Sequence, residues 1–203
     1  MKPFVLTALG VTLFLGFAGP SSAQTVEAAL LAGYRFNNDL FEAATNRPVD
    51  LDGAPVVGGV VNVGMGGGLW FEALFTRQEA EVTLPPGPSG PSARARIVVD
   101  QWLAGGRQEF GMHGARPFFT GVLGLTRYGA DGDGEGRFTV GAGGGVKVPV
   151  QRRIGFRFDS RVFTTFVDLD AGAGVCGAVG CFVAVNANVV WQIEFTADVV
   201  VVF

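Results

Sequence analysis

The sequence has almost no lysine, because Lys2 and Lys147 are its two lysines in 203 residues. A water-exposed protein surface usually carries many lysines, so their scarcity argues against an ordinary soluble exterior. The chain also has one histidine, His113, and two cysteines. Two thiols provide half of a tetrahedral zinc shell and His113 is distant from them in sequence, so we expect no metal site.

The body of the chain contains no long apolar run, although its mean hydropathy of +0.36 and its 48% of apolar residues are high for a soluble protein. A membrane helix needs about 18 consecutive apolar residues or more. In lipid, helices and closed barrels are the structures that satisfy every backbone polar group. High apolar content without a helical span therefore favours membrane-crossing strands.

One apolar run does occur, at the start of the chain, where Lys2 is followed by the apolar residues 4–18 and then by small residues up to Ala23. These are the three parts of a secretory signal peptide. We predict a cleavable signal peptide over residues 1–23 and a single domain over residues 24–203. An N-terminal membrane anchor is the competing interpretation.

Export has two consequences for the remaining chain. Removal of Lys2 leaves 14 basic and 18 acidic residues, so the net charge is 14 − 18 = −4, and a mildly acidic chain is a poor partner for nucleic acid. Export also places Cys176 and Cys181 in an oxidising compartment, and we predict a disulfide between them that pins a glycine-rich loop.

The last stretch of the chain, residues 189–203, alternates with a period of two residues. One face is apolar throughout, with Val189, Trp191, Ile193, Phe195, Ala197, Val199, Val201 and Phe203. The central positions of the other face are polar, with Gln192, Glu194, Thr196 and Asp198. This pattern predicts a strand with one apolar and one polar face. The strand is longer than the roughly 9 to 11 tilted residues that cross a bilayer.

Seven earlier segments also read as strands, at 26–36, 56–65, 69–82, 96–110, 118–128, 137–148 and 154–166. Long connections alternate with short turns, the long ones being 37–54, 83–93, 130–136 and 170–181. The fold class predicted is all-β, an eight-stranded antiparallel up-and-down transmembrane β-barrel with both termini in the periplasm and the long loops outside. The faces of 96–110 stay unassigned because Asp100 and Gln101 are adjacent.

Alternation alone does not say which face meets the solvent, because a soluble barrel that carries a ligand alternates too. The unbroken apolar face of residues 189–203, the charges in the middle of 154–166 and the missing lysines favour lipid outside. We therefore expect a protein of the bacterial outer membrane that contacts its lipid. A soluble periplasmic ligand carrier is an alternative.

The polar face then lines a narrow lumen. The charged residues expected there are Glu27, Arg35, Glu72, Lys147, Arg157, Asp159, Arg161, Glu194 and Asp198. Buried charges must pair, so Arg157 and Arg161 are expected to meet Asp159, Glu72 and Glu194 in a polar plug. An ion-selective constriction is the alternative. The aromatics expected in girdles at the two membrane interfaces are Phe36, Phe71, Phe119, Phe166, Trp191 and Phe203.

Two segments, Gly143 to Phe163 and Trp191 to Phe203, resemble the last hairpins of the outer-membrane β-barrel domain family, the small OmpA/OmpX-like or opacity-type porin family proteins. The resemblance implies a bare barrel whose external loops carry any surface role and meet an unknown extracellular partner. It also implies that Phe203, with Val201 and Val199, forms the C-terminal signal read by the barrel-insertion machinery.

Enzymatic chemistry finds little support. Ser89 and Ser92 lie in a proline-rich external loop, whereas His113 falls in a turn at the opposite end, so a serine–histidine pair is not expected. We predict no enzyme, no catalytic residues and no cofactor. The function expected is a structural or surface-interaction role with a lumen filled by side chains, and a narrow pore for small solutes or ions is the alternative.

Overall fold

The computed structural model describes residues 25–37, 40–41, 48–51, 53–84, 93–111, 114–130, 133–166, 175–177, 180–182 and 189–203. The segment predicted as a signal peptide, 1–23, lies outside these residues, as do Ser89, Ser92 and His113. Within the described ranges, no helix is both long and apolar enough to cross a membrane.

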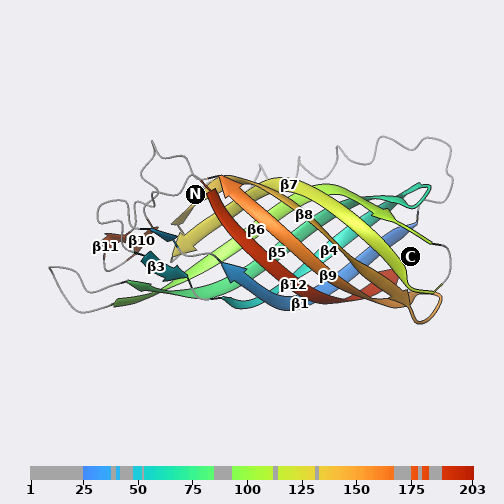
Figure 1. Ribbon diagram of the computed structural model, residues 1–203, viewed down its shortest axis with the longest axis horizontal. Coiled ribbons are helices and arrows are strands. Elements are labelled where there is room, and N and C mark those ends of the chain that lie inside the picture. The colour runs from blue at the N-terminus through green and yellow to red at the C-terminus, as the bar shows by residue number, and fades with distance from the viewer. Residues whose placement is uncertain are drawn as a thin grey trace, which may run out of the picture.

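Eight long strands close into one antiparallel barrel (Figure 1). They are β1 (Val26–Asn37), β4 (Ala54–Gly66), β5 (Leu69–Leu84), β6 (Ala93–Glu109), β7 (Arg116–Ala130), β8 (Asp133–Pro149), β9 (Ile154–Phe166) and β12 (Val189–Val202). Each pairs with the next along the chain, and β12 returns to pair with β1. The predicted eight-stranded up-and-down architecture is confirmed.

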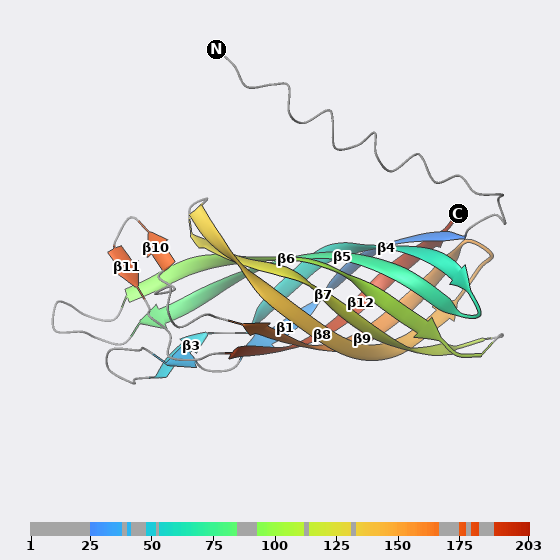
Figure 2. The same cartoon turned by 90° about the horizontal axis from the view of Figure 1, so that it is seen from above.

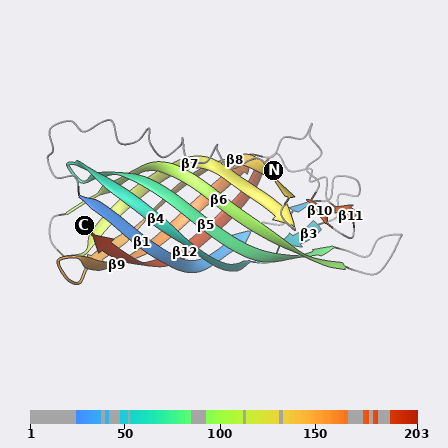
Figure 3. The same ribbon diagram turned by 180° about the vertical axis from the view of Figure 1, so that it is seen from behind.

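The register fixes the stagger of the barrel. The paired residues followed once around the wall are Glu27, Asn62, Glu72, Gly105, Val122, Gly141, Phe163, Gln192 and Asn37. The path starts and ends on β1, displaced by 37 − 27 = 10 residues. Eight strands with this stagger incline at about 40° to the barrel axis and leave an interior that their own side chains fill. The strands of the opposite wall are also inclined to the barrel axis, as the view from behind shows (Figure 3).

The two ends of the barrel differ. One end carries the start of β1, the last residue Phe203 and the short turns at 67–68, 110–115 and 150–153, and we call it the turn end. The other, the loop end, carries β2 (Leu40–Phe41), β3 (Pro48–Leu51), β10 (Val175–Gly177) and β11 (Gly180–Phe182) (Figure 2). The alternation of short and long connections thus sorts them to opposite ends.

Three of the predicted loops contain strand structure. The connection expected at 130–136 is much shorter, because Ala130 pairs directly with Asp133. The glycines of this stretch hide the alternation, yet their backbones continue the ladder. In 37–54, β3 pairs with β5 and extends the wall at the loop end. In 170–181, β10 pairs with β11.

Candidate functional site in the barrel interior

The two faces of each strand have opposite polarity, most clearly in β9. Arg157, Asp159 and Arg161 are buried in the interior, whereas Phe156 and Phe158 are exposed on the outer wall. In β12 the even-numbered residues from 190 to 200 are buried, and the odd-numbered ones from 191 to 199 are exposed. A soluble ligand-carrying barrel needs the reverse arrangement, because its lumen is apolar and its exterior polar. The structure therefore turns the apolar faces out.

The outer wall carries large apolar side chains all around the barrel. Leu30 on β1 is 78% exposed and Trp102 on β6 is 60% exposed. The six aromatics predicted for the girdles are all on this surface, at 44% to 76% exposure: Phe36, Phe71, Phe119, Phe166, Trp191 and Phe203. Such an exterior would aggregate in water, and it suits contact with hydrocarbon.

The structure also assigns the faces of β6. Gln101 is fully buried, whereas Asp100 lies on the outer wall, where its carboxylate accepts hydrogen bonds of 2.7 and 2.8 Å from Arg77 on β5. Two residues closer to the turn end, the rings of Phe75 and Trp102 pack at 4.2 Å between centroids. The outward ion pair between Arg77 and Asp100 marks the edge of the apolar band on the loop-end side.

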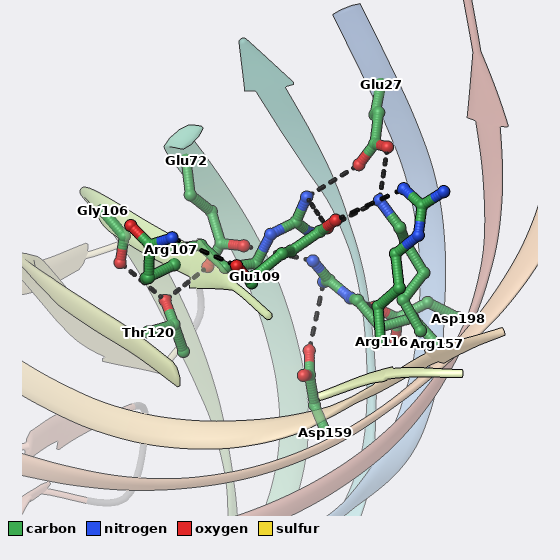
Figure 4. Close-up of polar contacts among 12 residues, drawn as sticks. Glu27, Glu72, Gly106, Arg107, Glu109, Arg116, Thr120, Arg157, Asp159 and Asp198 are labelled. Atoms are coloured by element: carbon green, nitrogen blue, oxygen red, sulfur yellow. Dashed lines mark hydrogen bonds and ion pairs between the residues drawn. The ribbon is translucent and has the colours of Figure 1, made fainter. Parts of the chain in front are cut away.

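Inside the barrel, the turn end holds a compact ionic cluster, shown in Figure 4. Lys147 on β8 donates to Glu27 on β1 at 2.6 Å and lies 2.6 Å from Glu109 on β6. Arg107 on β6 reaches the same two carboxylates at 2.7 and 2.9 Å. The ring of Trp70 lies 4.9 Å from the Lys147 ammonium. Two cations and two anions thus neutralise one another.

A second ionic cluster lies next to the first, further along the axis (Figure 4). Arg157 on β9 donates to Asp198 on β12 at 2.6 Å and to Glu72 on β5 at 3.1 Å. Arg161 binds Glu72 at 3.1 Å and Asp159 at 2.9 Å. All five groups are at most 5% exposed. Two arginines therefore hold three carboxylates in the centre of the lumen.

Glu194 does not join that cluster. In the register it lies opposite both Arg161 on β9 and Arg35 on β1. Its carboxylate forms an ion pair with Arg35, which donates through Nε at 2.9 Å and also through Nη2. The predicted pairing of Glu194 with Arg157 or Arg161 is thus wrong, because Arg161 turns toward Glu72.

Within the described residues, the loop-end half of the lumen is held by a chain of hydrogen bonds that starts at this ion pair and continues through neutral side chains. Arg35 donates to Thr76 at 2.7 Å, and Thr76 donates to Gln101 at 3.3 Å. Gln101 donates to Gln192 at 3.0 Å, and Gln192 donates to Asn37 at 2.7 Å. The chain of bonds begins on β1, passes through β5, β6 and β12, and returns to β1. It spans the lumen from wall to wall.

An apolar layer lies between the ionic clusters and this hydrogen-bonded chain. It consists mainly of Leu31, Leu74, Leu103, Val122 and Phe163. The same order is found on β5 and β9. On β5, Leu74 lies between Glu72 and Thr76, and on β9, Phe163 lies between Arg161 and Thr165. The lumen is therefore layered along its axis.

Strand β8 makes room for these large side chains. Its inward positions between Thr139 and Lys147 are all glycine, at 141, 143 and 145. A Cβ added to Gly141 would lie 2.5 Å from the ring of Phe163. The missing side chains on β8 thus let the Phe163 ring lie flat against the wall and fill the apolar layer.

Arg107 and Glu109 were not expected in the lumen, because the faces of β6 could not be assigned from sequence. The nine charged residues that the sequence did predict for the lumen all lie in the interior, with at most 5% exposure. The remaining candidates lie elsewhere. Cys176 and Cys181 are opposite each other in the β10–β11 ladder. Val199 and Phe203 are exposed on the outer wall and Val201 is half-buried.

No family model matches the sequence. No curated protein matches it either. Among solved structures, neisserial surface protein A (NspA) is 16% identical, with a TM-score of 0.53, 87% of this chain covered and 96% of that chain. The chain has the fold of the small outer-membrane β-barrels.

Two further outer-membrane-type barrels are similar at lower scores. Ail, the attachment invasion locus protein of Yersinia pestis, is 11% identical with a TM-score of 0.44, covering 86% of this chain and 97% of that chain. The N-terminal β-barrel domain of Pseudomonas aeruginosa OprF is 9% identical with a TM-score of 0.42, covering 87% and 96%. At 16% identity, the similarity to NspA concerns the fold alone. The role of the present chain has to be argued from its own residues.

Proposed function

We propose that the protein is an integral protein of the bacterial outer membrane, with a structural or surface-interaction role and a closed lumen. The observation that carries the proposal is the inverted polarity of the barrel. Charged side chains are buried in its interior, and leucine, phenylalanine and tryptophan side chains cover its exterior. In water, the barrel would leave its apolar side chains exposed and would gain little from the hydrophobic effect. In lipid, the outer side chains contact hydrocarbon, and the closed barrel pairs its backbone polar groups internally.

The dimensions agree with a membrane span. Each of the eight strands has between 12 and 17 residues, and about 9 to 11 tilted residues cross the hydrocarbon. The surplus falls at the loop end, where β5 and β6 pair as far as Leu84 and Ala93. Barrels of this class keep short turns in the periplasm and longer connections outside. By that rule, the turn end, which carries the start of β1 and Phe203, faces the periplasm.

A closed lumen is supported by its layers. Water and ions crossing it would have to break the ion pairs of the turn-end half, pass the side chains of the apolar layer and separate the amides of Gln101 and Gln192. Each step exposes a charge or a polar group to a poor environment. A narrow pore remains the rival reading, and single-channel conductance in planar bilayers separates the two. Silent bilayers support the closed barrel, and a stable unitary conductance contradicts it.

Without a conducting lumen, the loop end is the part left for an interaction. It carries the β2–β3 and β10–β11 pairs beyond the membrane span, on connections that the short turns of the other end lack. A disulfide between Cys176 and Cys181 would brace the second pair. The partner of this surface is an unidentified extracellular one. In this proposal Phe203, with Val201 and Val199, serves recognition by the insertion machinery, and no catalytic step is assigned.

The experiment is fractionation of a Gram-negative host that expresses the chain, combined with gel migration with and without boiling. We expect the protein in the outer-membrane fraction, resistant to extraction with urea, and with a heat-dependent shift in migration that reports a folded barrel. Recovery of folded protein from the soluble periplasmic fraction without detergent would contradict the proposal and favour the soluble ligand carrier.

A further inference from the structure

Strand β6 reaches further at the loop end than its neighbour β7 (Figure 1). Its ladder with β5 continues to the end of the strand, where Ala93 pairs with Leu84. Its ladder with β7 stops earlier, at Val98 and Gly129. Among the described residues, no strand pairs with the β7 side of residues 93–97. We call this segment the free edge.

The backbone groups that the free edge presents follow from a hydrogen bond at the other end of the same ladder. Phe110, just after β6, donates its N–H to the carbonyl oxygen of Pro117 on β7 at 2.9 Å. In an antiparallel ladder, the N–H and C=O of one residue point to the same side, and successive residues alternate. The β6–β7 register does not shift, so the even-numbered residues of β6 point away from β5. At the free edge these are Arg94 and Arg96.

The opposite side of the same hairpin is already extended by added strands. The ladder of β4 with β5 ends at Gln78. Further out, β3 pairs with β5 through Asp50 with Thr83 and Leu51 with Val82, and β2 pairs with β3 in turn. The protruding sheet therefore has the order β2-β3-β5-β6 and ends at the free edge. A sheet edge with unpaired donors and acceptors is a template for one more strand.

We propose that the free edge binds an extended segment of another protein, which adds to β6 as an antiparallel strand. The inference rests on the proposed surface-interaction role and gives it a binding site. Arg94 and Arg96 would each exchange two backbone hydrogen bonds with the added strand. On β5, Arg96 has Glu81 opposite it, whereas Arg94 has Thr83. Opposite charges in cross-strand positions stabilise a sheet, so the segment should carry an acidic residue opposite Arg94.

A second copy of this chain is a poorer occupant of the free edge. When two free edges pair antiparallel with the same face outward, at least one arginine of each copy lies opposite an arginine of the other. Like charges directly opposite each other destabilise a sheet. Charged residues on an edge strand are also a common protection against self-pairing. A foreign segment with an acidic residue avoids this repulsion.

The test uses the full barrel in nanodiscs of zwitterionic lipid and a fluorescein-labelled peptide as the probe. The peptide is Val-Thr-Val-Glu-Val-Thr-Val with both ends capped, and fluorescence anisotropy follows its binding. We expect saturable binding, and lysine in place of the glutamate of the peptide should weaken it at least three-fold. Absence of saturable binding, or equal binding of the two peptides, would overturn the proposal.

Two substitutions at one position separate backbone pairing from charge. Arg96→Pro removes an N–H that points to the free edge and leaves the ladder with β5 in place, so peptide binding should weaken at least ten-fold. Arg96→Gln removes the same charge and keeps the N–H, and it should change binding less than three-fold. Equal losses in the two variants would contradict strand addition.

Two further measurements keep the outcomes apart. The heat-dependent gel shift confirms that each variant is folded, and the fractionation tests the outer-membrane assignment without any peptide. A folded, membrane-inserted barrel that does not bind the peptide therefore rejects the free edge alone. If the unmodified chain forms a dimer in detergent that Arg96→Pro abolishes, a second copy occupies the free edge and the proposal of a foreign segment is wrong.

Discussion

The two halves of the lumen stabilise their buried polar side chains in different ways. The turn-end half is ionic, with four cations and five carboxylates arranged in two clusters: Arg107, Lys147, Arg157 and Arg161 with Glu27, Glu72, Glu109, Asp159 and Asp198. Among the described residues, the loop-end half has one buried ion pair, Arg35 with Glu194, and otherwise amides and hydroxyls. Removal of one partner should therefore cost much more in the turn-end half, since several carboxylates depend on each arginine there.

The largest effect is expected for Arg157→Met. This change leaves Glu72, Asp159 and Asp198 with one arginine, Arg161, so excess negative charge is buried. The free energy of unfolding should fall by about 5 kcal/mol, measured by urea titration of protein refolded in lipid vesicles. A loss below about 1 kcal/mol would mean that water in the lumen solvates these carboxylates.

Phe163→Ala tests the apolar layer between the halves. Loss of the fully buried ring should destabilise the barrel by about 4 kcal/mol and open a gap beside Gly141. Conductance in planar bilayers should then appear or rise. Phe158→Ala is the control, because its ring is on the outer wall of the same strand. If both variants conduct equally, the layer does not close the lumen.

Arg35→Met is the loop-end counterpart of Arg157→Met. It leaves a single buried carboxylate, Glu194, without its ion-pair partner, and should cost about 3 kcal/mol in the same urea titration. The double variant Arg35→Met/Glu194→Met should recover most of this loss, because no uncompensated charge remains. If Arg35→Met costs more than Arg157→Met, the contrast between the two halves fails.

The residues that line the lumen could be predicted from the sequence for some strands and not for others, and the reasons are physical. Strands β9 and β12 alternate without interruption, so their faces could be assigned from sequence. In β6, the outward Asp100 is stabilised by Arg77 on the neighbouring strand, and that partner cannot be known before the register. Arg107 and Glu109 were missed for this reason.

It was harder to predict from the sequence which lumen residues pair with each other than to predict which residues lie in the lumen. Glu194 lies opposite two arginines in the register, and its choice of Arg35 depends on where Arg161 turns. That choice follows from the stagger of the barrel, which sets which strands face each other across the axis. In 133–136 alternating glycines gave no pattern, although the ladder continues there.

Gly105→Ala should have a smaller effect than the charge and core changes, about 2 to 3 kcal/mol of unfolding free energy. A Cβ at this inward position would lie 1.9 Å from the carbonyl oxygen of Gly121, so the wall must shift. Gly121→Ala is the matched control, because nothing lies within 4 Å of its Cβ. Equal stability of the two variants would show that the wall at this point is pliable.

The smallest effect is expected for Arg77→Ala, on the outside. Its ion pair with Asp100 is exposed on the arginine side, with 53% of that side chain accessible, and exposed pairs contribute little to stability. Urea titration should show a smaller loss than for any of the other variants, and high salt should reduce it further. A loss comparable to that of Arg35→Met would mean that this pair is shielded from water.

The inverted polarity of the two walls is tested most directly by the three tryptophans. Trp102 and Trp191 are exposed on the outer wall, whereas Trp70 lies in the lumen mouth beside Lys147. Three variants, each keeping one tryptophan and replacing the others by phenylalanine, are refolded in vesicles whose acyl chains carry bromine, a contact quencher. The account predicts strong quenching of Trp102 and Trp191 and little quenching of Trp70. Strong quenching of Trp70 together with protected Trp102 and Trp191 would contradict it.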